Sequence, residues 1–300
     1  MIGNPAQPLI DFDPTEAFFI GIDSDGCAFD TMEVKHKECF TPNTIKHFGL
    51  QAVSKYAREA AGFVNLYSKW RGINRFPALL MVLELLAERR EVQKREVVVP
   101  RLPALHEWVA RGGPASNAGL EVAIRAADST EAAELQRVLN WSKAVNVAVS
   151  ETVRNIPPFP FVRQCLGKAS GGADIVVVSA TPGEALEREW HEHDLAKYAA
   201  VIAGQEMGTK AEHLRRATDS KYARDHVLMI GDAPGDLEAA WKNGALFYPI
   251  NPGFEAESWE RLCEEGLDRF FAGTYEGAYA AALIEEFEAL LPDTPPWARR

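Results

Sequence analysis

Residues 17–32 read AFFIGIDSDGCAFDTM, and this stretch decides the fold. It begins with an apolar run, Phe18 to Ile22, of the kind found in buried strands. Two carboxylates, Asp23 and Asp25, follow where the strand ends, and Gly26 comes directly after them. Ligands of open α/β sheets bind outside the carboxyl ends of the strands, so this segment indicates a reaction centre. A turn with two solvated aspartates is the alternative interpretation.

The later part of the chain alternates strand patterns with helix patterns. Apolar runs at residues 174–179, 199–203, 226–230 and 246–250 predict strands, and the amphipathic segments between them predict helices. This alternation is typical of a parallel sheet with right-handed crossovers. We therefore expect an α/β fold with a doubly wound, parallel, Rossmann-like sheet, to which the strand at Phe18–Ile22 also belongs.

The residues between these two parts have a helical pattern. One apolar helix face is predicted by the spacing of Phe63, Leu66, Tyr67 and Trp70. Breaks at residues 71–77 and 112–114 separate successive helices. We therefore expect an inserted all-α cap domain at residues 31–165, and a Rossmann-like catalytic core formed by residues 1–30 and 166–300.

Composition narrows the class of protein. Of the 300 residues, 47% are apolar and 25% charged, which is ordinary for a soluble globular protein, and no apolar run approaches the roughly eighteen residues of a membrane span. The N-terminus lacks a secretory pattern, and the four cysteines are widely spaced. We expect a cytoplasmic protein without a membrane partner. A net charge of -11 argues against nucleic acid as a partner.

Polar side chains also follow the other predicted strands. Ser179 and Ala180 stand at the end of one strand, Lys210 lies shortly after the next, and Asp232 and Asp236 follow a third. Because parallel strands end at the same edge of a sheet, we expect these residues to converge on Asp23 and Asp25. Carboxylates bind hard cations such as Mg²⁺, while a lysine and a hydroxyl offset the charge of a phosphoryl group.

These four clusters, in this order, resemble the motifs of the haloacid dehalogenase-like superfamily, which consists mostly of phosphatases. The resemblance covers residues 17–30 and 173–251, and the inserted helices stand where the family has its type 1 cap. It implies that Asp23 is the nucleophile and a metal ligand. It also implies that Asp25 is the general acid and base and ligates the metal through its backbone carbonyl.

The resemblance assigns roles to the remaining clusters as well. It implies that Ser179, Ala180 and Lys210 bind phosphate, and that Asp232 and Asp236 complete a Mg²⁺ site. The chain departs from many relatives at one point, because Lys210 is followed by alanine where they have proline. Lys221 is the alternative lysine.

From this resemblance we expect a Mg²⁺-dependent phosphatase that cleaves a small phosphorylated metabolite, such as a sugar phosphate, through an aspartyl-phosphate. A sugar phosphomutase is the alternative, since Asp30 and Thr31 match the Asp-Thr pair of those enzymes; the same pair also fits a helix N-cap. A non-catalytic binding protein that kept the fold is the third possibility. In the cap, Arg71 and Arg75 are candidates for substrate contact, with a solvated surface as the alternative.

Overall fold

The structure, a computed structural model, describes residues 4–299. They divide into two compact units: a sheet unit of residues 4–32 and 155–292, and a helical unit of residues 33–154 and 293–299. The chain passes between the units after residues 32, 154 and 292. Within residues 4–299, no helix is both long enough and apolar enough to cross a lipid bilayer.

The sheet unit contains a five-stranded sheet, all of whose strand pairs are parallel, in the order β3-β2-β1-β4-β5. The strands are β1 (Phe18–Ile22), β2 (Ala173–Val178), β3 (Val201–Ala203), β4 (Val227–Gly231) and β5 (Leu246–Pro249). Ile22, the last residue of β1, lies beside Val177 of β2 and Ile230 of β4. The predicted α/β class and parallel sheet are confirmed, and the carboxyl ends of the three central strands are level.

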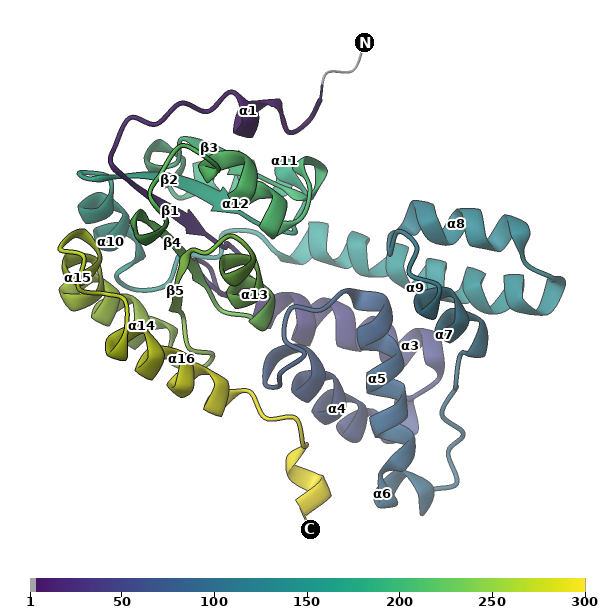
Figure 1. The fold of residues 1–300 in the computed structure, drawn as a ribbon. Helices are drawn as coiled ribbons and strands as arrows, with labels where there is room; N and C mark the ends of the chain where they lie inside the picture. The colour runs from purple at the N-terminus through teal and green to yellow at the C-terminus, as the bar shows by residue number, and fades with distance from the viewer. Residues whose placement is uncertain (1–3, 300) are drawn as a thin grey trace. The chain divides into compact units, whose positions relative to one another are not determined.

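Helices cover both faces of this sheet (Figure 1). Because successive side chains of a strand point to opposite faces, Ile20 and Ile22 pack into one core and Phe19 into the other. The first core is formed with α10 (Val162–Ala169), α11 (Gly183–Glu192), α14 (Glu255–Arg261) and α15 (Leu267–Phe271). The second is formed with α1 (Gln7–Ile10), α12 (Lys210–Thr218), α13 (Pro234–Lys242) and α16 (Ala278–Leu290).

The helical unit has a core of its own around Phe76 and Trp141. Its helices are α3 (Thr41–Phe48), α4 (Ser54–Leu66), α5 (Arg75–Glu88), α6 (Arg90–Gln93), α7 (Pro103–Ala110), α8 (Asn117–Ala126) and α9 (Ser129–Thr152), and α2 (Thr31–Val34) leads into it. Within the described part of the chain, two segments are π-helical, Lys35–Phe40 and Leu262–Gly266. Single 3₁₀ turns occur at Gln51–Val53, Ala196–Tyr198, Gln205–Met207, Arg224–His226 and Pro296–Arg299.

The boundaries of the two units differ from the domain boundaries expected from the sequence. The insertion ends at residue 154 and not at 165, because Phe159, Phe161 and Cys165 pack in the core of the sheet unit. The expected helix face of Phe63 to Trp70 is also shortened, since α4 ends at Leu66 and Tyr67 is 40% exposed.

The C-terminal residues 293–299 belong to the helical unit, although α16 before them belongs to the sheet unit. The Trp297 ring packs edge-on against Phe63, with 5.7 Å between ring centroids, and the Arg89 guanidinium lies 4.4 Å from its centroid. The C-terminal segment is therefore part of the packing of the helical unit.

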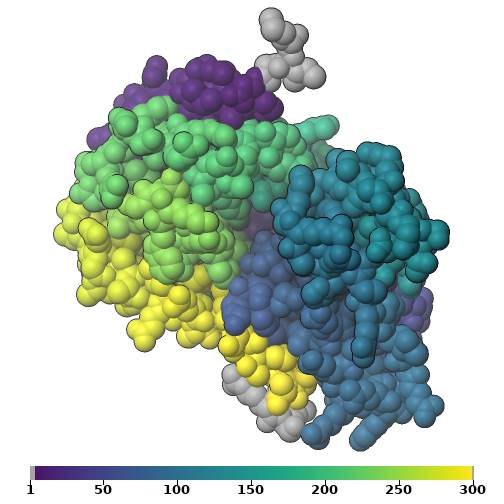
Figure 2. All heavy atoms as spheres, turned by 45° about the vertical axis from the view of Figure 1, so that its right-hand side comes forward, coloured from purple at the N-terminus to yellow at the C-terminus, as the bar shows by residue number. Residues whose placement is uncertain are grey.

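The N-terminal segment is bound at the end of the sheet where the strands begin, opposite their carboxyl ends. At the start of β2 the Asp174 carboxylate accepts hydrogen bonds from the backbone N–H groups of Thr15 and Glu16 and from the Tyr222 hydroxyl, at 2.7–2.9 Å. Lys221 donates to the backbone carbonyl of Phe12 at 2.5 Å. Figure 2 shows this purple segment lying over green residues of the same unit.

Candidate active site

Asp23 extends the line of β1 by one residue. Its N–H donates to the carbonyl of Ile230 in β4 at 3.0 Å, and its side chain is buried. The chain turns immediately afterwards, because the Ser24 carbonyl accepts the N–H groups of Ala28 and Phe29 at 2.9 and 3.0 Å. Gly26 takes φ +79° inside this turn, a backbone conformation that a side chain disfavours. Asp23 and Asp25 are thus held between a central strand and a tight turn.

Lys210 reaches Asp23 from the first turn of α12. The helix begins there because Thr209 is its N-cap, in a capping box with Glu212. The Lys210 ammonium donates to Asp23 Oδ2 and to Asp236 Oδ1, both at 2.7 Å. The alternative lysine, Lys221, binds backbone carbonyls of the N-terminal segment instead.

Asp232 and Asp236 lie on the turn from β4 into α13. The Asp236 carboxylate accepts the N–H of Ala233 at 3.1 Å through its second oxygen. Gly231 allows this close approach, since a Cβ there would lie 2.3 Å from Asp236 Cβ. Among the residues that the structure describes, Asp23, Asp232 and Asp236 form a group with one carboxylate oxygen each, all within 4.8 Å of one another.

Burial and the neighbouring charges shift the pKa values of this group. Burial raises the pKa of Asp23 well above its usual value, with Asp236 and Asp232 adding to the rise and Lys210 opposing it. Burial alone would lower the pKa of Lys210, but its carboxylate neighbours Asp23 and Asp236 raise it overall. The Lys210 ammonium is shared by the buried carboxylates of Asp23 and Asp236, and Asp232 adds a third buried carboxylate to the group. A set of three carboxylate oxygens this close together fits Mg²⁺.

The carboxylate of Asp25 is held differently from that of Asp23. Its Oδ1 accepts the hydroxyl of Thr31, the first residue of α2, and its Oδ2 accepts the hydroxyl of Thr181 at 2.5 Å. Sequence reasoning missed both of these threonine contacts. The positions of the threonines were a signal: Thr181 stands two residues after Ser179, and Thr31 belongs to the Asp-Thr pair.

The end of β2 supplies the remaining predicted groups of the sheet unit. The Ser179 N–H donates to the carbonyl of Ala203 in β3 at 3.0 Å, and its Oγ accepts the N–H of Thr181 at 3.2 Å. Ser179 is buried and Ala180 is exposed. The structure thus places Ser179 at the same end of the sheet as Asp23.

No family model and no curated protein matches the chain. Among solved structures, a candidate phosphoglycolate phosphatase from Lactobacillus delbrueckii subsp. bulgaricus has 18% sequence identity and a TM-score of 0.49, over 85% of this chain and 98% of that one. A HAD-superfamily hydrolase of subfamily IA from Geobacter sulfurreducens has 15% identity and a TM-score of 0.41, over 78% and 88%.

A third solved structure is that of a candidate β-phosphoglucomutase from Thermotoga maritima. It has 17% identity and a TM-score of 0.39, over 77% of this chain and 84% of that one. The fold itself rests on the sheet order and register given above.

Arg71 and Arg75 both make contacts inside the helical unit. Arg71 Nη1 donates to the carbonyl of Leu66 at 2.9 Å. Arg75 Nη1 donates to Ser142 Oγ at 3.0 Å and Asn146 Oδ1 at 2.6 Å, which joins α5 to α9, and burial lowers its pKa to about 10. Their contact with a substrate stays a prediction.

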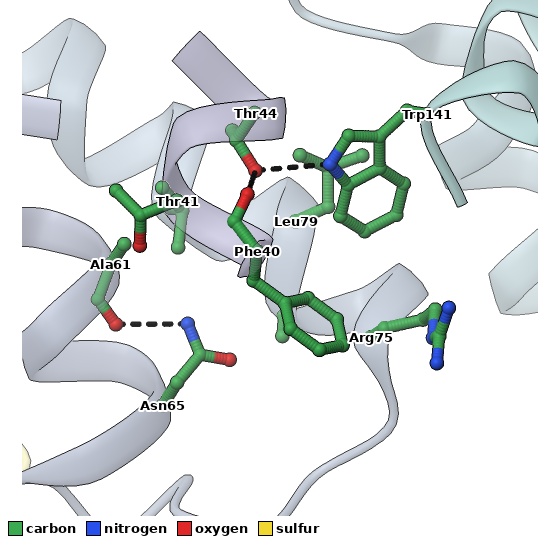
Figure 3. Close-up of a pocket in the computed structure, with 10 residues that line it drawn as sticks. Phe40, Thr41, Thr44, Ala61, Asn65, Arg75, Leu79 and Trp141 are labelled. Carbon is green, nitrogen blue, oxygen red and sulfur yellow. Dashed lines mark hydrogen bonds between the residues drawn. The ribbon is translucent and has the colours of Figure 1, made fainter. Parts of the chain in front are cut away.

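A small cavity lies in the helical unit between α3, α4, α5 and α9. Figure 3 shows Phe40, Thr41, Asn65, Leu79 and Trp141 around it. Its volume is about 20 Å³, enough for about one water molecule. A phosphorylated metabolite needs a far larger site, so this cavity is not a candidate for substrate binding.

Proposed function

We propose that this chain is a Mg²⁺-dependent phosphohydrolase that cleaves a small phosphorylated metabolite through an aspartyl-phosphate on Asp23. The observation that supports this most is the setting of Asp23, a buried carboxylate at the end of the central strand with the Lys210 ammonium at 2.7 Å. Asp232 and Asp236 supply further carboxylate oxygens within 4.8 Å. Bound by these three aspartates, Mg²⁺ would offset the negative charge of the phosphoryl oxygens.

The proposed reaction has two steps. A carboxylate oxygen of Asp23 forms a bond to phosphorus while the bond from phosphorus to the alcohol oxygen breaks, and Asp25 gives that oxygen its proton. Asp25, now a carboxylate, then takes a proton from water, whose oxygen bonds to phosphorus as the bond to Asp23 breaks. Inorganic phosphate leaves, and both aspartates return to their first state.

The other residues of the site have binding and orienting roles in this proposal. Lys210 and the Ser179 hydroxyl bind the phosphoryl oxygens, together with the backbone N–H of Ala180. Thr31 and Thr181 hold the Asp25 carboxylate near the leaving group. In the helical unit we propose Arg71 and Arg75 as substrate contacts.

A sugar phosphomutase remains the second candidate. One contact favours it: the hydroxyl of Thr31, from the Asp-Thr pair that mutases share, donates to Asp25. A mutase would return the phosphoryl group to a second hydroxyl of the sugar. A screen of sugar phosphates and other phosphorylated metabolites separates the two, because a phosphatase releases phosphate and a mutase yields an isomerised sugar phosphate.

The first test is hydrolysis of an aryl phosphate by the purified protein with Mg²⁺. Asp23→Asn removes the proposed nucleophile, so we expect its rate to fall by at least about 10³-fold with an unchanged circular dichroism spectrum. Asp13→Asn is the matched control, since Asp13 is an exposed member of another Asp-x-Asp segment. Equal rates for Asp23→Asn and wild type would contradict the assignment.

A further inference from the structure

Ser24, the residue between the two aspartates, takes part in a chain of hydrogen bonds whose Ser24 and Trp190 members are buried. The Trp190 indole N–H donates to Ser24 Oγ at 3.0 Å, and the Ser24 hydroxyl donates to Glu189 Oε2 at 3.0 Å. Ser24 and Trp190 are both 0% exposed. Because an indole can only donate and a serine hydroxyl has one proton, the direction of this chain is fixed.

The backbone of Ser24 connects this chain to the proposed nucleophile. Its N–H donates to Asp23 Oδ1 at 2.8 Å, while Lys210 binds Asp23 Oδ2. The two oxygens of Asp23 are therefore oriented by two different donors. A shift of Ser24 would change the orientation of the Asp23 carboxylate.

One helix anchors both aspartates. Glu189 and Trp190 belong to α11, which begins two residues after Thr181, the residue whose hydroxyl binds Asp25. The Trp190 ring also meets Phe29, at the end of the turn, edge-on at 5.9 Å between centroids. Thr181, just before α11, thus binds Asp25. Glu189 and Trp190, in the last turn of α11, bind Ser24, whose N–H binds Asp23.

We propose that Ser24, Glu189 and Trp190 are positioning residues for phosphoryl transfer, which hold the Asp23 carboxylate in the orientation needed for attack on phosphorus. This inference rests on the proposed function. None of the three needs to touch the substrate, since Ser24 acts through its own N–H on Asp23 and the other two act through Ser24. Small displacements of a reacting group lower the rate of the chemical step more than they weaken binding.

The test compares Ser24→Ala and Trp190→Phe with wild type, with Mg²⁺ and an aryl phosphate. We expect kcat to fall by about 10- to 100-fold while KM changes by less than about threefold. The double variant should be no slower than the slower single variant, because both substitutions remove the same hydrogen bond. Glu189→Gln keeps an acceptor for the Ser24 hydroxyl, so its kcat should stay within about threefold of wild type.

Trp141→Phe is the matched control. Trp141 is a buried tryptophan of the helical unit whose indole N–H donates to Thr44 Oγ1 at 3.1 Å, as Figure 3 shows. The chemical change equals that in Trp190→Phe. We expect a similar loss of thermal stability with an unchanged kcat.

Three results would overturn the inference. They are an unchanged kcat in Ser24→Ala and Trp190→Phe, a change confined to KM, or an equal loss of kcat in Trp141→Phe. An inactive wild-type protein would instead contradict the proposed function. In that event amide hydrogen exchange still tests whether the Ser24 side chain stabilises the turn at residues 24–29. Ser24→Ala should speed the exchange of the Ala28 and Phe29 N–H groups, and unchanged exchange would refute this role of Ser24.

Discussion

Asp23 is subject to two opposing effects. Burial and the nearby carboxylates raise its pKa, whereas Lys210 at 2.7 Å stabilises the charged form. A nucleophile must be ionised to attack phosphorus, so a cation beside Asp23 serves the chemistry as well as the charge balance. The two aspartates that add to this rise, Asp236 and Asp232, lie with Asp23 in the group of carboxylates that could hold such a cation. The proposed nucleophile and the proposed metal site therefore share the Asp23 carboxylate.

His213 predicts a pH dependence of stability. It is buried on α12, and burial, helped by the positive charges of Arg216 and Lys210, lowers its pKa to about 4. Below about pH 6.5 the unfolded chain binds a proton at this residue that the folded chain does not. The contribution of neutral His213 to stability is thus complete above pH 6.5 and is lost as the pH falls toward 4.

Urea unfolding at pH 7 and pH 5 measures this effect. We expect the free energy of unfolding to fall by an amount that is about 2 kcal/mol larger in wild type than in His213→Leu. The comparison cancels the contributions of other titrating groups. An equal decrease in both proteins would contradict the buried, neutral state of His213.

At the residue scale the sequence indicated the acidic residues, the lysine and Ser179, but it missed the hydrogen bonds made by the hydroxyls of Ser24, Thr31 and Thr181. Asp23, Lys210 and Asp232 stand out because charged residues directly follow apolar strand patterns or open the next helix. The partners of Ser24 and Thr31 depend on side-chain direction in a tight turn, which no spacing rule encodes.

At the scale of elements, we expect the largest loss of stability from a substitution at the start of β2. Asp174 is only 6% exposed; burial would raise its pKa, but hydrogen bonds from Thr15, Tyr222 and Glu16 lower it overall. Asp174→Ala would leave these donors without their acceptor. We expect a loss of about 2–4 kcal/mol in the free energy of unfolding, measured with urea.

Tyr222→Phe is the companion variant to Asp174→Ala. It removes one donor and leaves the carboxylate its other partners, so about 1 kcal/mol should be lost. A smaller effect for Asp174→Ala than for Tyr222→Phe would show that the carboxylate does not fix the N-terminal segment.

The five strands were predictable because each is an apolar run, and their observed ends differ from the predicted ones by only a few residues. The helix α8 was not predicted, although its Leu120, Ala123 and Ile124 fall at helical spacing and pack in the core of the helical unit. The expected helix face from Phe63 to Trp70 is too long, because the apolar spacing continues beyond Leu66 but the helix does not.

For the whole molecule, the C-terminal segment is the least predictable feature. Its prolines indicate an irregular tail, yet residues 293–299 pack with the helical unit through Trp297. Partners for that ring come from Phe63 and Arg89, which lie far away in the sequence. Only the folded arrangement of α4 and α5 creates the place where the ring packs.

Trp297→Ala tests this packing. Loss of the ring contact with Phe63 and of the cation–π contact with Arg89 should lower the free energy of unfolding by about 1–3 kcal/mol. Trp241→Ala is the control, because Trp241 is 59% exposed on α13. An equal effect of the two variants would mean that residues 293–299 add nothing specific to the helical unit.

The most direct measurement is chemical trapping of the proposed aspartyl-phosphate. The protein is mixed with Mg²⁺ and an aryl phosphate, quenched, reduced with borohydride and digested. An acyl phosphate on Asp23 would be reduced to homoserine, and peptide mass spectrometry would find this change at residue 23 only when substrate is present. An active protein with Asp23 unmodified, or with the modification at Asp25, would contradict the account.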